Sequence, residues 1–192
     1  MKTKPKAPLA LLFMSGILGA TLTFGGDFVI KDIHQNKQEP LKSIEKNPVV
    51  LIFITNDCPI ANGYVPEINR IYEKYSVRKV KLTLVHVDPK LSDEAALQHA
   101  REYALKPPVV IDRKHELVRL SGAEVTPEAV VFDSEGKIVY RGRINDRYTG
   151  FGDRRNTVRE HNLRAALDAI LGGRKVKVKE TQPWGCFIEP LK

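Results

Sequence analysis

Cysteine is scarce in this sequence: only Cys58 and Cys186 occur among its 192 residues. Two cysteines allow at most one disulfide within the chain, and such a bond persists mainly in an oxidising compartment. The five histidines show no spacing to one another or to a cysteine that is typical of metal ligands. We therefore expect no metal site and no cofactor, and the two thiols are the candidates for chemistry.

The chain also has only a modest excess of positive charge and few long hydrophobic runs. The net charge is +8, but three of the lysines lie within the first six residues, and the rest of the chain has 28 basic against 23 acidic residues. This excess is too small to indicate nucleic acid binding, and no zinc-finger, recognition-helix or RNA-binding signature accompanies it. After residue 26, no hydrophobic run is long enough to cross a membrane.

The N-terminus has the pattern of an export signal. The basic stretch MKTKPK precedes an uncharged run from Ala7 to Gly26 that contains LALLFMSGIL. Cleavage near residues 20–23 would remove this segment, whereas an uncleaved run of residues 7–26 is just long enough to anchor the chain in a membrane. We assign residues 1–23 to a signal peptide or anchor and expect an exported protein, in the periplasm or otherwise outside the cytoplasm.

Hydrophobic periodicity predicts one α/β domain over residues 24–172. The run Val49–Ile54 is typical of a strand buried on both faces, and apolar residues at helical spacing follow it from Val65 to Tyr75. Further strands are expected near residues 80–87, 109–111, 129–132 and 138–140, and further helices near residues 92–105, 116–120 and 158–171. Such an order predicts a mixed central sheet flanked by helices on both faces. Residues 173–192 form a C-terminal tail.

The first cysteine lies where a strand gives way to a helix. Cys58 follows the Val49–Ile54 strand, and Pro59 suits the first turn of the next helix because its missing N–H needs no partner there. A helix N-terminus stabilises a thiolate, which is the nucleophile in disulfide exchange and in attack on peroxide. Thr55 is placed to donate its hydroxyl to this sulfur. We therefore expect a reactive Cys58 sulfur that is accessible to solvent. The competing interpretation is a buried, inert cysteine.

Two segments resemble the thioredoxins and related redoxins. FITNDCPIANGYVPEINRIYEKY, with Cys58 and Pro66, is similar to their active-site segment, and VTPEAVVFDSEGKIVYRGRI is similar to the segment that holds their cis-proline loop and terminal hairpin. The resemblance implies a thioredoxin-like fold and a cis peptide at Thr126-Pro127 that lies beside Cys58 and Pro59 in a groove for an extended substrate chain. It is greatest to exported redoxins of the alkyl hydroperoxide reductase and thiol-specific antioxidant (AhpC/TSA) superfamily and to the thioredoxins of cytochrome c maturation.

The sequence departs from these families at three positions. Ala61 occupies the place of the second cysteine of C-x-x-C, so disulfide exchange confined to that motif is excluded. Asn62 occupies the corresponding place in the C-x-x-x-C motif of copper-delivery relatives, which excludes copper binding by that motif. Leu51 replaces the proline of the peroxiredoxin pattern P-x-x-x-[TS]-x-x-C, and Pro127 stands near the place of a peroxiredoxin arginine.

Cys186 is the one candidate for a thiol that resolves an intermediate on Cys58. Its neighbours Trp184, Phe187 and Ile188 are apolar, so we expect the tail to pack against the domain or a partner subunit. If the tail docks near the groove, Cys186 would meet Cys58 within one chain or across a homodimer. The alternatives are a packing residue that anchors the tail and a permanent structural disulfide.

Two functional hypotheses follow. In the first, the chain is a thiol-dependent oxidoreductase whose Cys58 attacks a protein disulfide or a peroxide, with Cys186 or an external thiol reductant completing the cycle. In the second, it is a non-catalytic binding or scaffold module that engages a partner through its groove and the arginine-rich loop of residues 141–155. For that loop, a solvated face with internal ion pairs is favoured over a binding surface.

Overall fold

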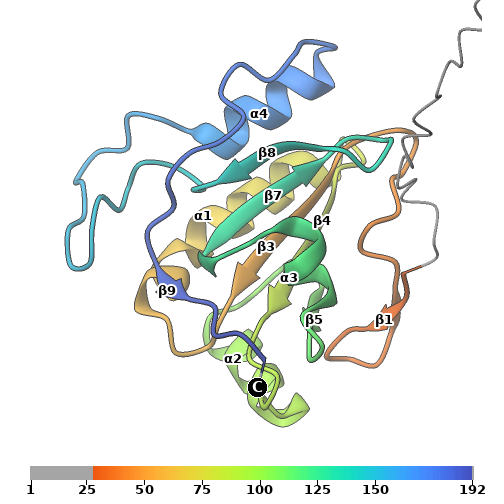
Figure 1. Ribbon diagram of the computed structural model, residues 1–192, viewed down its shortest axis with the longest axis vertical. Helices are drawn as coiled ribbons and strands as arrows, with labels where there is room; N and C mark the ends of the chain where they lie inside the picture. Colours follow the sequence, from red (N-terminus) through yellow and green to blue (C-terminus); the bar gives the residue numbers. More distant parts are fainter. Residues whose placement is uncertain (1–27, 192) are drawn as a thin grey trace, which may run out of the picture.

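A computed structural model describes residues 28–191 of the chain, which fold around a five-stranded mixed sheet (Figure 1). The strand order is β5-β4-β3-β7-β8. Three parallel strands, β3 (Val49–Ile54), β4 (Lys81–His86) and β5 (Val109–Ile111), form one half of the sheet. The other half is a hairpin, in which β7 (Glu128–Phe132) pairs antiparallel with β3 and β8 (Ile138–Gly142) pairs antiparallel with β7. The predicted mixed sheet is therefore confirmed.

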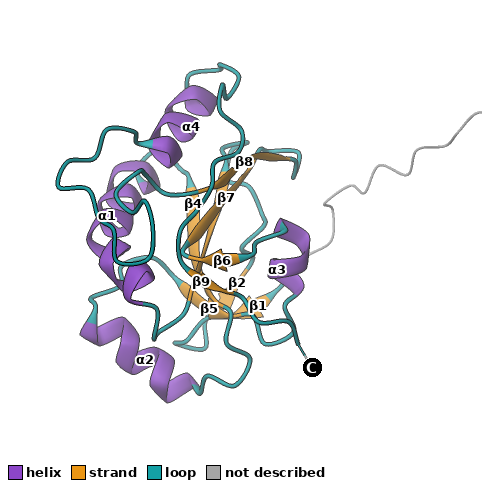
Figure 2. Ribbon diagram, turned by 60° about the vertical axis from the view of Figure 1, so that its left-hand side comes forward, coloured by secondary structure: helices purple, strands orange, loops and turns teal. Residues whose placement is uncertain are grey.

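Helices cover both faces of this sheet (Figure 2). The helices α1 (Pro59–Ser76), α2 (Asp93–Glu102) and α4 (Asn162–Leu171) lie to one side, and the short α3 (Glu116–Ser121) lies to the other. Among residues 28–191, no helix combines the length and apolar character that crossing a bilayer requires.

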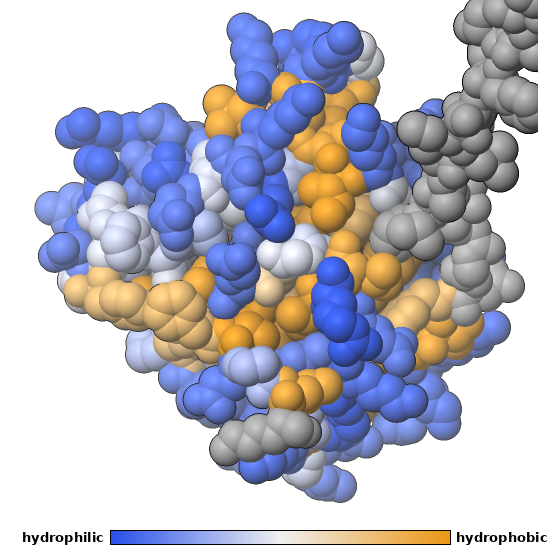
Figure 3. Space-filling view, in the orientation of Figure 1, coloured by the Kyte–Doolittle hydropathy of each residue, from blue (hydrophilic) through white to orange (hydrophobic). Residues whose placement is uncertain are grey.

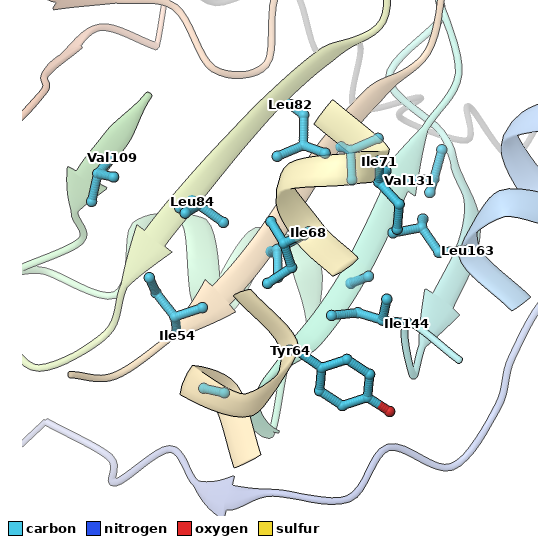
Figure 4. Close-up of a cluster of buried hydrophobic side chains, with 14 of the residues drawn as sticks. Ile54, Tyr64, Ile68, Ile71, Leu82, Leu84, Val109, Val131, Ile144 and Leu163 are labelled. Atoms are coloured by element: carbon cyan, nitrogen blue, oxygen red, sulfur yellow. The ribbon is translucent and has the colours of Figure 1, made fainter. Parts of the chain in front are cut away.

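The core divides at β3, every residue of which is buried. Val50, Ile52 and Ile54 belong to one buried cluster with α1 residues such as Ile68, and Figure 4 shows Ile54 and Ile68 in that cluster. The alternate β3 residues belong to a second cluster on the opposite face of the sheet. This division follows from the two-residue period of a strand, which points successive side chains to opposite faces. Burial of each such side chain stabilises the fold by roughly 1.5–3 kcal/mol. The buried β3 fixes the place where the chain emerges towards Cys58.

Two short strand pairs lie outside the main sheet. The strands β1 (Ile30–Lys31) and β2 (Lys37–Gln38) pair near the start of the described chain. The strands β6 (Val125–Thr126) and β9 (Cys186–Phe187) pair antiparallel, although 60 residues separate Thr126 from its partner Cys186. This second pair carries the C-terminal tail back to the end of β3.

Two predicted helix limits are wrong. The helix expected from residue 158 begins at Asn162, because the amides of Arg159 and Glu160 donate instead to Oδ1 of Asp146, at 2.8 and 3.0 Å. The helix expected to reach residue 105 ends at Glu102, where Ala104 adopts a left-handed conformation with φ of 52°. The signal peptide or anchor of residues 1–23 lies outside the described residues. The domain limits 24–172 and 173–192 remain predictions.

Candidate active site

Cys58 caps the N-terminus of α1. Its backbone is extended, with φ of −80° and ψ of 111°, and its Sγ accepts a hydrogen bond from the amide of Ala61 at 3.5 Å. Pro59 occupies the first helical turn, as the sequence predicts. The free amides and the dipole of the 18-residue helix therefore stabilise negative charge on this sulfur.

The peptide bond between Thr126 and Pro127 is cis and lies beside Cys58. The thiol of Cys58 donates a hydrogen bond to the carbonyl oxygen of Thr126, 3.1 Å from Sγ. The sequence-based prediction of a cis-proline next to this cysteine is therefore confirmed.

Thr55 does not donate its hydroxyl to Cys58, so that prediction is wrong. Its Oγ1 lies 3.4 Å from Oγ1 of Thr126, whose hydroxyl also reaches the carbonyl oxygen of Cys186 at 3.4 Å. The two threonines thus link the end of β3 to the cis-proline loop and to the tail, and they leave the sulfur to other partners.

The tail brings the second cysteine to the first. The β6–β9 pairing sets Cys186 opposite Thr126, and the two sulfur atoms lie 2.8 Å apart. Both residues are free thiols in this structure. Burial raises the pKa of the Cys186 thiol to about 12, and the adjacent Cys58 sulfur contributes to the rise.

The expectation of an accessible Cys58 sulfur is wrong for this conformation. Cys58 is 0% exposed, because the tail covers the groove beside the cis-proline. The fit depends on Gly185: a Cβ atom there would lie 1.9 Å from the carbonyl oxygen of Thr126. The sequence signal for this contact was the apolar run around Cys186, which predicted packing but not the groove as its place.

A second attachment holds the tail upstream of Cys186. The hydroxyl of Thr181 lies 2.7 Å from the hydroxyl of Tyr140 and accepts a hydrogen bond from the amide of Arg143 at 3.1 Å. Downstream, the amide of Ile188 donates to the carbonyl oxygen of Glu124 at 2.9 Å. The tail is therefore fixed on both sides of its cysteine.

Comparisons with known proteins agree with this geometry. The sequence pattern of the AhpC/TSA family matches residues 26–141, which is more than half of the chain. The chain belongs to the AhpC/TSA family.

This AhpC/TSA-family protein is similar to a named enzyme and to a protein of known structure. It is 28% identical to "Thiol-disulfide oxidoreductase ResA" of Bacillus cereus over 145 residues, which cover 68% of this chain and 82% of the relative. A crystal structure of an uncharacterised conserved protein from Geobacillus kaustophilus matches with a TM-score of 0.72 at 28% identity, covering 85% of this chain and 88% of the other.

StoA from Bacillus subtilis matches with a TM-score of 0.51 at 23% identity, covering 59% of this chain and 84% of StoA, and supports the fold. The thioredoxin-like fold and the classification as a thiol-dependent oxidoreductase are confirmed.

Two histidines near the site were not recognised from the sequence of this AhpC/TSA-family protein. His86, at the end of β4, and His99, on α2, place their ring nitrogens 3.2 Å apart, and His99 Nε2 lies 2.9 Å from Oδ1 of Asn62 on α1. The side-chain Nδ2 of Asn62 donates to the carbonyl oxygen of Asn56, in the turn before Cys58, at 2.8 Å. Thirteen residues separate the two histidines, so their meeting depends on tertiary structure and leaves no local motif.

Burial controls the chemistry of these rings. It lowers the pKa of His86 to about 3, with a smaller contribution from His99, and it lowers the pKa of His99 as well. Within residues 28–191, no three His, Cys, Asp or Glu side chains form a group that could hold a metal ion.

Glu128 is another residue that the sequence analysis missed. It follows Pro127 directly, and its buried Oε2 accepts hydrogen bonds from the amides of Glu124 and Val125, at 2.8 and 3.4 Å. Burial raises the pKa of this carboxyl group. The side chain holds the cis-proline loop from within the chain, so its role is to fix the shape of the groove.

The arginine-rich loop is largely satisfied within the protein. Arg143 pairs with Glu160 at 2.7 Å, and Arg155 pairs with Asp146 at 3.3 Å. Hydrophilic surface gathers over the loop on the left of Figure 3. The interpretation as a solvated face with internal ion pairs fits these contacts. Within the loop, Tyr148 packs on α1, with its ring centroid 5.0 Å from that of Tyr64.

Proposed function

We propose that this chain is an exported thiol–disulfide oxidoreductase in which Cys58 and Cys186 form a reversible disulfide within one chain. The observation that carries the proposal is the 2.8 Å separation of the two sulfur atoms beside the cis-proline loop. A disulfide bond is about 2.05 Å long, so bond formation needs a shift of less than about 1 Å. Pairing within the chain makes a homodimer unnecessary for this chemistry.

The catalytic cycle exchanges two electrons with a partner protein. When the dithiol reacts with a partner disulfide, Cys58 and Cys186 lose two hydrogens and become a disulfide, while the partner becomes a dithiol. An external thiol reductant returns the protein to its dithiol form by the reverse exchange. Cys58 is the nucleophile of the pair, since its sulfur accepts the Ala61 amide at the N-terminus of α1.

Disulfide exchange is favoured over peroxide reduction by the surroundings of Cys58. Its sulfur contacts the Thr126 carbonyl, the Ala61 amide and the Cys186 sulfur. Among residues 28–191 no arginine donates to it, so no guanidinium group is in place to polarise a peroxide. Peroxide reduction is therefore the second candidate, supported by the AhpC/TSA family match alone.

Export is proposed from the sequence of residues 1–26, which has the charge and hydropathy pattern of a signal peptide. The test is expression of the full chain in a bacterium, followed by N-terminal sequencing and protease treatment of intact spheroplasts. Protection of the protein from protease until the cells are lysed would contradict export. A retained N-terminus on an accessible protein would identify the segment as an anchor.

The redox proposal is tested by mass spectrometry and a reductase assay on the full chain. Mild oxidation of the reduced protein should lower its mass by about 2 Da and join the Cys58 and Cys186 peptides. The wild type should accelerate thiol-driven reduction of a protein disulfide, and Cys58→Ser and Cys186→Ser should each lower that rate at least tenfold. A Cys58→Ser variant with wild-type activity would favour the scaffold hypothesis instead.

A further inference from the structure

The two sulfur atoms of the proposed pair differ in their access to solvent. Cys58 is completely buried beneath the tail, whereas Cys186 is partly exposed. Cys186 also lines a surface cavity of about 420 Å³, together with Asp57, Asp88 and Glu189. A reacting partner that leaves the tail in place therefore has access to Cys186 and not to Cys58.

We propose that this cavity is the entry site for the partner thiol, which exchanges at Cys186, and that Cys58 exchanges only with Cys186. The inference rests on the proposed function and assigns the order of its steps. Cys58 keeps its role as the nucleophile, but the sulfur that it attacks belongs to the tail of its own chain.

When the Cys58–Cys186 disulfide is reduced, the reaction proceeds in two thiol–disulfide exchanges. The partner thiol gives its proton to solvent, and its sulfur bonds to Cys186 while the Cys186–Cys58 bond breaks and Cys58 leaves with the electron pair as a thiolate. A second partner thiol gives its proton to solvent and attacks the partner sulfur of the mixed disulfide, and the bond to Cys186 breaks so that Cys186 leaves as a thiolate. Both cysteine thiolates then take up a proton from solvent. The partner ends as a disulfide and the protein as a dithiol. When the dithiol is oxidised, the Cys186 thiol gives up its proton and its sulfur attacks a partner disulfide, which forms the mixed disulfide and releases one partner sulfur as a thiolate. The Cys58 thiolate then attacks the Cys186 sulfur, and the second partner sulfur leaves as a thiolate.

The identity of the leaving group supports this order. Attack at Cys186 expels Cys58, whose negative charge is stabilised by the Ala61 amide and the dipole of α1. Attack at Cys58 would instead expel Cys186, whose sulfur accepts no amide hydrogen bond among residues 28–191, so that its thiolate lacks this stabilisation and leaves more slowly. Access and leaving-group chemistry therefore select the same sulfur.

The charge of the cavity indicates the class of partner. Three carboxylates, those of Asp57, Asp88 and Glu189, line it, and among residues 28–191 none of them takes part in an ion pair within 4 Å. The exposed ring of Phe187 adds an apolar wall. These features fit an extended cysteine-containing peptide that carries cationic side chains, and they disfavour an acidic thiol peptide.

The site of exchange is tested with the oxidised full chain, whose Cys58–Cys186 disulfide is verified first by peptide mapping. A synthetic peptide with one cysteine between two arginines is added, and the reaction is stopped with acid and a thiol-alkylating reagent. We expect the peptide adduct on Cys186 and the alkyl group on Cys58. The adduct on Cys58 with the alkyl group on Cys186 would overturn the proposal. Failure of the disulfide to form at the first step would instead contradict the proposed function.

The partner class is tested by charge substitution. Glu189→Gln removes one carboxylate from the cavity, and Glu135→Gln, in the exposed turn between β7 and β8, removes the same charge elsewhere. We expect Glu189→Gln to slow exchange of the arginine-flanked peptide about threefold, with no change for a serine-flanked peptide. Glu135→Gln should leave both rates unchanged. Equal rates for both peptides in all three proteins would overturn the assignment to cationic partners.

Discussion

At the scale of single residues, the contact between the tail and the cis-proline loop depends on the absence of a side chain. Gly185 precedes Cys186, and a Cβ at this position would lie 1.9 Å from the Thr126 carbonyl oxygen and 3.1 Å from the Pro127 nitrogen. Both of those atoms belong to the backbone, so neither can turn aside as a side chain would. Only glycine lets the two backbones approach this closely.

The substitution Gly185→Ala should therefore lift the tail from the groove while both cysteines remain. We expect the alkylation rate of Cys58 in the reduced protein to rise at least tenfold, and the free energy of unfolding to fall by about 1–3 kcal/mol. Peptide mapping of the alkylated protein and urea denaturation measure the two effects.

The neighbouring Phe187→Ala is the matched control for Gly185→Ala. This side chain is 78% exposed and its backbone pairing with Val125 is independent of the ring, so Cys58 should stay protected. A Gly185→Ala protein in which Cys58 reacts as slowly as in the wild type would show that the groove is not closed by this contact.

At the scale of secondary structure elements, a network of hydrogen bonds joins two helices and a strand beside the site. His86 belongs to β4, His99 to α2 and Asn62 to α1. The side-chain amide of Asn62 extends the network to the turn before Cys58. The roles of the two His99 nitrogens depend on the tautomer of the ring. Because Oδ1 of Asn62 can only accept, His99 Nε2 donates to it, and His99 Nδ1 then accepts a hydrogen bond from His86 Nε2. His86 Nδ1 then remains a buried acceptor without a partner among the described residues.

This hydrogen-bond network should make the stability of the protein depend on pH. His86 has a pKa of about 3 in the folded protein, below the unfolded value of about 6.5, so it takes up a proton on unfolding in that window. The free energy of unfolding should therefore fall as the pH drops below 6.5, by about 1.4 kcal/mol per pH unit for one such proton. Urea denaturation between pH 7 and pH 4.5 measures this slope.

His86→Phe should flatten that slope, whatever its effect on stability at pH 7. The exposed His161→Gln serves as the control and should retain the wild-type slope. Glu128 acts in the opposite sense: because its pKa is raised in the folded protein, its contribution to stability is lost as the pH rises through that folded pKa. This contribution is the same in the wild type and in both variants. Equal slopes for His86→Phe and the wild type would refute the assignment.

The elements that the sequence predicted well are those specified by local patterns. The strand Val49–Ile54, with its continuous apolar run, has the predicted limits, and the cis peptide at Pro127 followed from a resemblance of adjacent residues. The start of α4 was missed because a carboxylate from another segment, Asp146, binds the amides that a longer helix would have used.

The residues of the site were predictable from the sequence, but the covering of Cys58 by the C-terminal tail was not. Cys58 and the cis-proline could be found from their flanking sequences. The burial of Cys58 could not, because it results from a two-residue strand, β9, that pairs with a partner 60 residues away. So short a strand has no periodicity of its own, and its pairing is a tertiary interaction.

At the scale of the whole molecule, the proposed disulfide would close a very long loop. Cys58 and Cys186 are 128 residues apart, so the bond would join the start of α1 to the end of the tail and enclose most of the fold. A cross-link stabilises a protein mainly by restricting the unfolded chain, and the effect grows with the length of the loop.

We therefore expect the oxidised protein to be the more stable form, by up to about 5 kcal/mol at 25 °C for a loop of this length. Urea denaturation of the protein held in its oxidised and then its reduced form measures the difference, and in the reduced form the midpoint should lie lower. The double variant Cys58→Ser, Cys186→Ser should have one midpoint under both conditions. By linkage, each kcal/mol of added stability makes the disulfide harder to reduce while the chain is folded. If oxidation leaves the wild-type midpoint unchanged, the two cysteines are not joined within one chain, and the electrons reach the protein by another route.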